Sequence, residues 1–207
     1  MSRQGLGSIA TLMLNVAAGA FGDAAIAGMS IVTRISFFTY AMVIGLGQGF
    51  QPLCGFCYGA KLYGRVKEAF FFCIKCGTVF LSVCALLGFI FSTSIISIFR
   101  DDAAVVAVGS VALRWQVLSF PLVASIVLTN MLMQTIRKPV RANIVAAARS
   151  GLFFIPLIFI LPYFFGLLGV EMCQMWADCC SFAVAVPIAW SAFRDMRREK
   201  MELGKSH

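Results

Sequence analysis

The sequence predicts an all-α membrane protein, a six-transmembrane-helix bundle. Hydrophobic residues make up 60% of the 207 residues and charged residues only 13%, and the mean hydropathy is +0.91. A soluble domain of this size needs a more polar exterior, and a disordered chain has far fewer apolar residues. The apolar residues also run in long unbroken stretches, as transmembrane helices of ~20 residues require, whereas a β-barrel needs alternating segments of ~10 residues.

Six apolar segments account for most of the chain. They are Leu6–Gly22, Ala24–Phe56, Ala69–Phe99, Ala103–Ile136, Ala142–Leu168 and Met172–Phe193. The first has 17 residues and is short for a span, whereas the second and fourth have 33 and 34 and must tilt, kink or project beyond the bilayer. We therefore expect a six-helix transmembrane lobe over residues 1–193, followed by a basic cytoplasmic tail over residues 194–207.

The connectors between these segments alternate in charge. Six spans place two connectors and the tail on one side of the membrane, and this side holds eleven Lys and Arg residues: Lys61, Arg65, Lys67, Arg137, Lys138, Arg141, Arg194, Arg197, Arg198, Lys200 and Lys205. The other side holds Arg100 beside Asp23, Asp101, Asp102 and Glu171. The positive-inside rule then puts both termini in the cytoplasm, with the chain in the cell (inner) membrane. Since the basic residues are spread over three regions, no nucleic-acid partner is expected.

Three charged residues lie inside the predicted spans. Arg34 and Arg114 lie about 15 and 16 Å from the start of their segments, and Asp178 lies about 9 Å from its own, at 1.5 Å per helical residue. Charged groups at such depth usually face a protein interior or a wet cavity. Asp178 therefore has two interpretations, an internal ion pair with Arg114 or Arg34, or a site linked to protons or substrate.

Uncharged polar residues form a second set of candidates. Each of them could line a cavity or could join two helices by hydrogen bonds, which is the commoner use of Asn and Gln in membranes. They are Asn15, Gln48, Gln51, Gln116, Asn130 and Gln134.

The cysteines include a spacing that is typical of zinc sites. Cys54-x-x-Cys57 and Cys73-x-x-Cys76 match that template. They nevertheless close one apolar helix and open the next, where cysteine is a common small filler and a zinc site would lack polar supporting groups. We therefore expect no metal site. The sequence also lacks hydrolase, metalloprotease, Walker A and Rossmann signatures, so we expect no enzymatic activity and no cofactor.

Several short motifs together carry a resemblance to a known family. They are Gly22–Ala27, Ile31–Ile35, Gly45–Pro52, Gly59–Ala60, Arg65–Lys67, Leu132–Ile136, Phe153–Pro156 and Leu161–Val170. In this combination, which covers nearly the whole chain, the sequence resembles the C-terminal half of a multidrug and toxic compound extrusion (MATE) transporter of the MepA-like bacterial branch.

The resemblance implies a fold and a function. Family members have twelve helices in two six-helix lobes around a central cavity, and they export cationic amphipathic compounds in exchange for H⁺ or Na⁺. The chain would supply helices seven to twelve, beginning inside helix seven, and would need an N-terminal lobe or a second copy of itself. A lipid or polysaccharide flippase-like lobe, and an inactive fragment of a split or truncated transporter, are the alternatives.

The resemblance also implies which residues line the cavity. The first, second and fourth segments would face it, so the candidates for binding substrate or ion are Asn15, Gln48, Gln51 and Gln116, together with the charged residues Arg34, Arg114 and Asp178.

Overall fold

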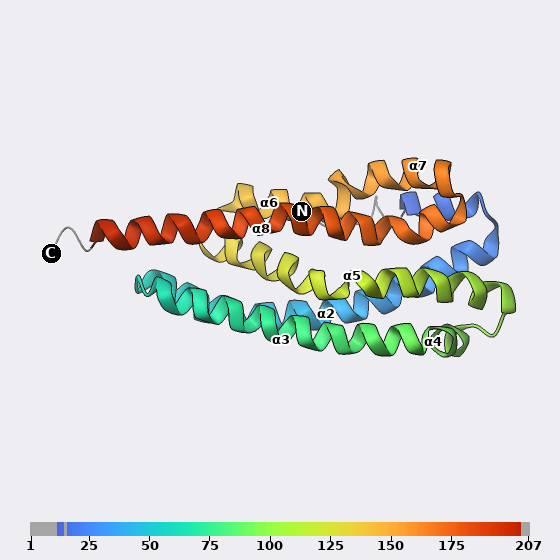
Figure 1. Cartoon of the computed structure of the whole chain (residues 1–207), viewed down its shortest axis with the longest axis horizontal. Coiled ribbons are helices and arrows are strands. Elements are labelled where there is room, and N and C mark those ends of the chain that lie inside the picture. The colour runs from blue at the N-terminus through green and yellow to red at the C-terminus, as the bar shows by residue number, and fades with distance from the viewer. Residues whose placement is uncertain (1–11, 15, 204–207) are drawn as a thin grey trace.

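The computed structural model describes residues 12–14 and 16–203, which are almost entirely helical and contain no strand (Figure 1). Helical residues 12–14 and 16–19 come first. The elements that follow are α2 (Asp23–Gly59), α3 (Tyr63–Ile90), α4 (Ser92–Phe99), α5 (Ala103–Thr135), α6 (Pro139–Ala147), the π-helical turn η1 (Ala148–Leu152), α7 (Phe154–Phe165) and α8 (Leu167–Leu203). The prediction of an all-α membrane fold is confirmed.

Two of the six predicted helical segments are interrupted. Four helices in the described chain are long and apolar enough to cross a membrane, namely α2, α3, α5 and α8 up to Glu202. The third predicted segment covers most of α3 and all of α4, and these two helices meet at Phe91. The fifth contains α6, η1 and the 12-residue apolar helix α7.

The interruption at η1 has a local cause. Pro156 has no backbone N–H, so it cannot donate to the carbonyl of Leu152 as a regular α-helix would require. In the turn before it, the N–H of Phe153 donates to the carbonyl oxygen of Ala148 at 3.2 Å, a step of five residues instead of four. One extra residue in the turn rotates the side chains of η1 relative to a continuous helix.

Helix α5 is the centre of the bundle. In its most apolar stretch 61% of the residues are buried, against 28% or less in α2, α3 and α8. It packs against all three of those helices, and Figure 1 shows it running between α8 and the α2–α3 pair. The outer helices therefore keep one apolar face exposed, as expected where lipid or a second lobe covers them.

Glycine allows α2 and α5 to approach closely. A Cβ atom on Gly28 of α2 would lie 3.1 Å from the backbone nitrogen of Gly109 on α5. A Cβ atom on Gly109 would in turn lie 3.0 Å from Cγ2 of Ile96 on α4. Small residues at such crossings are the usual means of packing helices in a membrane, where no hydrophobic effect drives the helices together.

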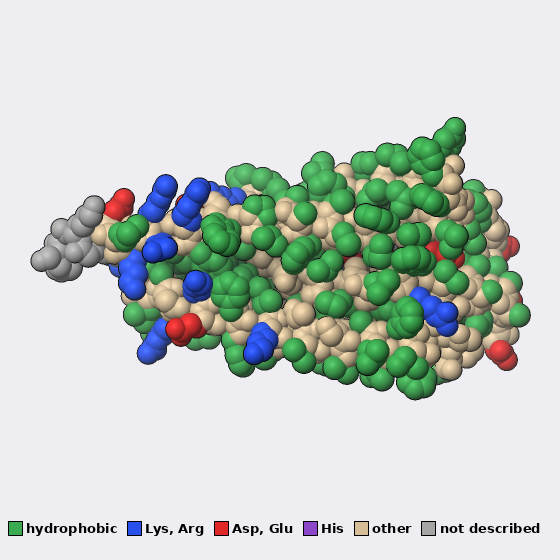
Figure 2. Space-filling view, viewed as in Figure 1, with side chains coloured by type: hydrophobic (Ala, Val, Ile, Leu, Met, Phe, Trp, Pro, Cys, Tyr) green, Lys and Arg blue, Asp and Glu red, His purple; other side chains and the backbone are tan. Residues whose placement is uncertain are grey.

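The two ends of the bundle differ in charge. The connections α2–α3 and α5–α6 and the C-terminal end of α8 lie at one end, and the connections α4–α5 and α7–α8 lie at the other (Figure 1). Lys and Arg side chains gather at the first end, while hydrophobic side chains are spread over the rest of the visible face (Figure 2). The two basic connectors and the end of α8 thus share one side, as the sequence predicts. The predicted position of the N-terminus lies outside the described residues.

Contacts at the basic end hold α8 against its neighbours. The carboxylate of Asp195 accepts hydrogen bonds from Lys138 Nζ at 2.5 Å and from Arg141 Nη1 at 3.1 Å. The hydroxyl of Tyr63 donates to Glu199 Oε2 at 2.8 Å. Helix α8 continues through residue 193 into the predicted tail without a break and ends at Leu203.

Candidate functional site

A seam of polar side chains runs along the inner face of α8. Glu171, Gln174, Asp178 and Ser181 follow one another at spacings of three, four and three residues, which places them on one side of a helix. Glu171, Asp178 and Ser181 are buried, and Gln174 is partly buried. Polar groups inside a membrane bundle are costly unless they are paired, so they mark structural networks or functional sites.

Asp178 is the centre of this seam. Its side chain is fully buried, and both carboxylate oxygens accept hydrogen bonds. Oδ1 accepts from Arg149 Nε at 2.8 Å and from Gln174 Nε2 at 3.2 Å, and Oδ2 accepts from the Ser119 hydroxyl at 2.8 Å. The carboxylate therefore joins α8 to η1 and to α5 in the interior of the lobe.

Arg149 connects the same network to α2. Its guanidinium carbon lies 4.4 Å from the centroid of the Tyr40 ring, within the range of a cation–π interaction. Two small cavities border both residues: one of about 20 Å³ also touches Asn130, and one of about 10 Å³ also touches Gln116. These volumes are close to what one water molecule needs, and polar side chains form part of the wall of each cavity.

The ion-pair interpretation of Asp178 was correct in kind but wrong in partner. The acid pairs with Arg149, which the sequence analysis did not single out, and not with Arg114 or Arg34. Arg114 is exposed on α5, where its Nε donates to Ser92 Oγ at 2.9 Å and its guanidinium lies 5.8 Å from the Phe89 ring centroid. The structure therefore does not bring the three predicted charges together.

The predicted glutamines fall into two groups. Gln116 is buried on α5, and its Nε2 lies 3.4 Å from the Ser119 hydroxyl that bonds Asp178, so it belongs to the buried network. Gln48 is exposed and Gln51 partly buried, both on α2. Gln48 and the exposed Arg34 are 14 residues apart on this helix, about four turns, and so share one outward face. Asn15 lies outside the described residues.

Asn130 and Gln134 serve helix packing. Asn130 Nδ2 donates to the carbonyl oxygen of Ala142 at 2.6 Å, which joins α5 to α6. Gln134 Nε2 in turn donates to the side-chain oxygen of Asn130. The helix-joining interpretation therefore describes Asn130, whereas Gln134 bonds within α5 and supports Asn130.

Glu171 is a second buried carboxylate that the sequence analysis misplaced. It was expected in a connector beside Asp23, but it lies inside α8 with 4% of its surface exposed. Its Oε2 has no hydrogen-bond partner in the part of the chain that the structure describes. The spacing to Asp178, seven residues or about two helical turns, is the signal that would have placed both acids on one face.

The cysteine pairs are divided between core and surface. Cys54 and Cys57 are buried, Cys73 is partly buried and Cys76 is exposed. Among the described residues, no group of three or more His, Cys, Asp or Glu side chains could hold a metal ion.

Similar sequences are multidrug exporters. Multidrug export protein MepA of Staphylococcus saprophyticus is 27% identical over 193 residues, which are 93% of this chain and 42% of that protein. MepA of Staphylococcus aureus is 29% identical over 180 residues, 86% of this chain and 39% of that protein. The chain thus spans less than half the length of these relatives.

Similar structures are transporters too. The Vibrio cholerae MATE transporter VcmN in its bent form superposes with a TM-score of 0.88 at 19% identity, over 95% of this chain and 45% of that one. A MOP superfamily transporter from Pyrococcus furiosus has a TM-score of 0.88 at 17% identity, over 94% and 44%. These likenesses establish the fold. The MatE family model matches residues 4–160, and the chain therefore belongs to the MatE family of membrane transporters.

Proposed function

We propose that this chain forms the C-terminal half of a multidrug efflux antiporter that exports cationic amphipathic compounds in exchange for H⁺ or Na⁺. The relatives named as multidrug export proteins match 86–93% of the chain, but the chain covers only 39–42% of their length. One six-helix lobe is about half of a two-lobe transporter. The substrate site would then lie between this lobe and an N-terminal lobe, or between two copies of the chain.

The observation that carries the proposal is that two polar side chains lie on an exposed face of α2, which also carries Phe37 and Phe38. Arg34 and Gln48 lie on it, well inside a 37-residue apolar helix. A charged side chain in direct contact with lipid at this depth would cost several kcal/mol, about 2.5–3.5 on insertion scales. The face is therefore suited to a water-filled cavity that a second lobe completes.

The buried network is the candidate site for ion coupling. Asp178 holds Arg149 on the π-helical turn, and Arg149 contacts Tyr40 of α2, the helix that carries Arg34 and Gln48. A proton or Na⁺ bound to the Asp178 carboxylate would compete with Arg149 for it. Release of Arg149 would free η1 and α2 to shift, and ion binding would thereby change the balance between outward and inward states. Glu171, the second buried acid of the seam, is the alternative ion site.

The proposed orientation puts the basic end of the bundle in the cytoplasm. This end carries the connectors with Lys61 and Arg137 and the C-terminal turns of α8. Excess Lys and Arg in short connectors favours the cytoplasmic side of a cell membrane. The orientation is testable by labelling from either side of the cell.

The flippase alternative needs a cationic cavity for lipid phosphates. Arg34 and Arg114 are the two arginines that would supply it. Arg114 instead contacts Phe89 and Ser92, where α3 meets α4, whereas Arg34 lies on the outward face of α2 with Gln48. This arrangement favours the drug antiporter.

Ethidium efflux in pump-deficient cells tests the proposal. The chain would be expressed alone and together with its upstream coding region, with the membrane content of each protein checked by immunoblot. Efflux only with the upstream region supports a half-transporter, and efflux by the chain alone supports a self-assembled pair. Absence of ethidium efflux in both cases, with both proteins in the membrane, would overturn the antiporter proposal in favour of a flippase or an inert fragment.

A further inference from the structure

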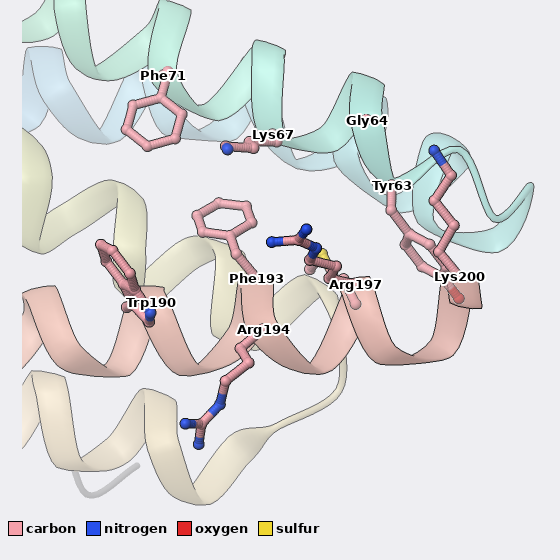
Figure 3. A pocket seen from close by; sticks show the side chains of 10 residues that line it. Tyr63, Gly64, Lys67, Phe71, Trp190, Phe193, Arg194, Arg197 and Lys200 are labelled. Carbon is pink, nitrogen blue, oxygen red and sulfur yellow. The ribbon is translucent and has the colours of Figure 1, made fainter. Parts of the chain in front are cut away.

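A groove between α3 and α8 lies at the basic end of the bundle, away from the seam around Asp178. Its volume is about 460 Å³. Side chains from both helices line it, as Figure 3 shows: Tyr63, Lys67 and Phe71 from α3, and Trp190, Phe193 and Arg197 from α8. Lys200 closes the end nearest the C-terminus.

The lining changes character along the groove. On α3, the order Tyr63, Lys67, Phe71 advances four residues at a time, so the polar groups lie toward the basic end and the ring lies deeper. On α8 the order runs the same way, with Trp190 deepest and Lys200 at the end. The groove therefore has a cationic mouth and an aromatic floor, which is the profile of a bound amphiphile with an anionic head.

The aromatic floor is a packed unit. The rings of Phe71 and Phe193 stack with centroids 5.9 Å apart, and Phe193 also packs edge-on against Phe70 at 5.1 Å. Trp190 beside them is 75% exposed. Trp190 lies four residues before Arg194, where the basic part of α8 begins, and an exposed Trp at such a position is typical of the membrane interface.

Among the described residues, the groove lining contains no acid that would neutralise the cations at the mouth, and Lys67 Nζ lies 5.9 Å from the centroid of the Phe71 ring. Figure 3 shows Lys67 and Arg197 directed into the gap between the helices, whereas Arg194 points away from it. The neighbouring acids have other partners: Glu199 accepts the Tyr63 hydroxyl, and Asp195 binds Lys138 and Arg141. The positive charge at the mouth is thus left without a matching anion in the lining.

We propose that this groove binds an anionic phospholipid, with the headgroup phosphate at Lys67 and Arg197 and the acyl chains along Phe71, Phe193 and Trp190. Charge complementarity and the direction of the polarity gradient carry the assignment. Basic residues at the membrane surface attract anionic lipid. Contact with the aromatic floor would hold the acyl chains of one lipid in a defined position. The site would act independently of substrate transport.

Fluorescence quenching at Trp190 tests the proposal. The chain has three Trp residues, so Trp115→Phe and Trp176→Phe leave Trp190 as the single reporter. The full chain would be placed in nanodiscs with brominated-chain phosphatidylglycerol or, at the same fraction, brominated-chain phosphatidylcholine. We expect stronger quenching by the anionic lipid, with a local preference on the order of tenfold. Because both leaflets contain the probe, the result depends on neither orientation nor transport.

A matched pair of variants separates the groove from general charge. Lys67→Gln with Arg197→Gln removes the two cations of the mouth, whereas Arg65→Gln with Arg198→Gln removes two exposed cations of the same helices that do not line the groove. The proposal expects the anionic preference to vanish in the first variant and to persist in the second. Equal quenching by both lipids, or equal loss in both variants, would overturn it. Quenching by neither lipid would indicate a protein surface over Trp190 and would also overturn it.

Discussion

Arg149 donates from Nε to Oδ1 of Asp178 at 2.8 Å, and this pair joins the π-helical turn η1 to α8 in the interior of the lobe. The two residues are 29 positions apart. Because the acid is fully buried and the arginine side chain is only 18% exposed, water and salt screen the attraction between the two charges only weakly. A pair in such a place either fixes the structure or takes part in the working cycle, and the following variants distinguish these roles.

Asp178→Asn should strongly destabilise the chain. The amide keeps the size of the carboxylate but leaves Arg149 as a buried charge without its counter-ion, a loss of about 3–5 kcal/mol. Asp195→Asn is the matched control on the same helix, because its partners Lys138 and Arg141 are partly exposed and such pairs contribute about 1 kcal/mol or less. Thermal unfolding in detergent measures both. Similar melting temperatures for the two variants would contradict the prediction.

The double variant Asp178→Asn with Arg149→Gln separates structure from coupling. Removing both charges leaves no unpaired ion, so stability should recover most of what the single variant loses. If the pair only holds the fold, efflux in the assembled transporter should recover as well. We expect a folded protein in which efflux no longer depends on the ion gradient. Restored ion-coupled efflux would reject a coupling role for Asp178.

Glu171→Gln should increase or preserve stability. The glutamate is buried and its Oε2 has no hydrogen-bond partner within the described residues, so a neutral amide of the same shape relieves a desolvation cost of about 1–3 kcal/mol. Thermal unfolding provides the measurement, with Glu68→Gln, an exposed position on α3, as the control. A large drop in stability for Glu171→Gln alone would reveal a partner that the carboxylate requires.

Gly28→Ala should weaken the contact between α2 and α5. The added methyl would lie 3.1 Å from the backbone of Gly109, and backbone cannot move aside as a flexible side chain can, so we expect a loss of about 1–3 kcal/mol. Gly49→Ala on the same helix meets no atom within 4 Å and should be neutral or stabilising by up to ~1 kcal/mol. The comparison isolates packing from helix propensity, and equal effects of the two variants would refute it.

Gln48→Cys should react with a membrane-impermeant thiol reagent. The prediction follows from the exposed face of α2 that carries Arg34 and Gln48, which the proposed function places in a water-filled cavity. The experiment replaces the eight native cysteines first, and it uses Val79→Cys, exposed on α3 among apolar neighbours, as the lipid-facing control. Labelling of Gln48→Cys alone is expected. Equal protection of both positions would place lipid or protein against this face of α2.

The positions of the spans and the charge difference between the ends were predictable from the sequence, and the interruptions were less so. The predicted segments Ala103–Ile136 and Ala24–Phe56 agree closely with α5 and α2, since hydropathy is a property of each residue and sums along the chain. The break at Phe91 and the π-helical turn depend on backbone hydrogen bonds. Hydropathy carries no information about those bonds. The sequence shows that Pro156 lacks a backbone N–H, but not that the turn before it becomes π-helical.

For the buried site, too, the sequence predicted the depth of the acid but not its partner. By itself the sequence determined that Asp178 would lie inside the lobe, because a carboxylate within an apolar span must avoid lipid whatever its neighbours are. Only the tertiary structure decided that its partner is Arg149. That choice depends on the extra residue in η1 and on how α8 is rotated against α5, and such rotations are set by packing between segments far apart in sequence, such as the approach of Gly28 to Gly109. The free energy of transferring a side chain into the membrane depends on that residue alone. The choice of an ion-pair partner depends on how the helices pack in the assembled bundle.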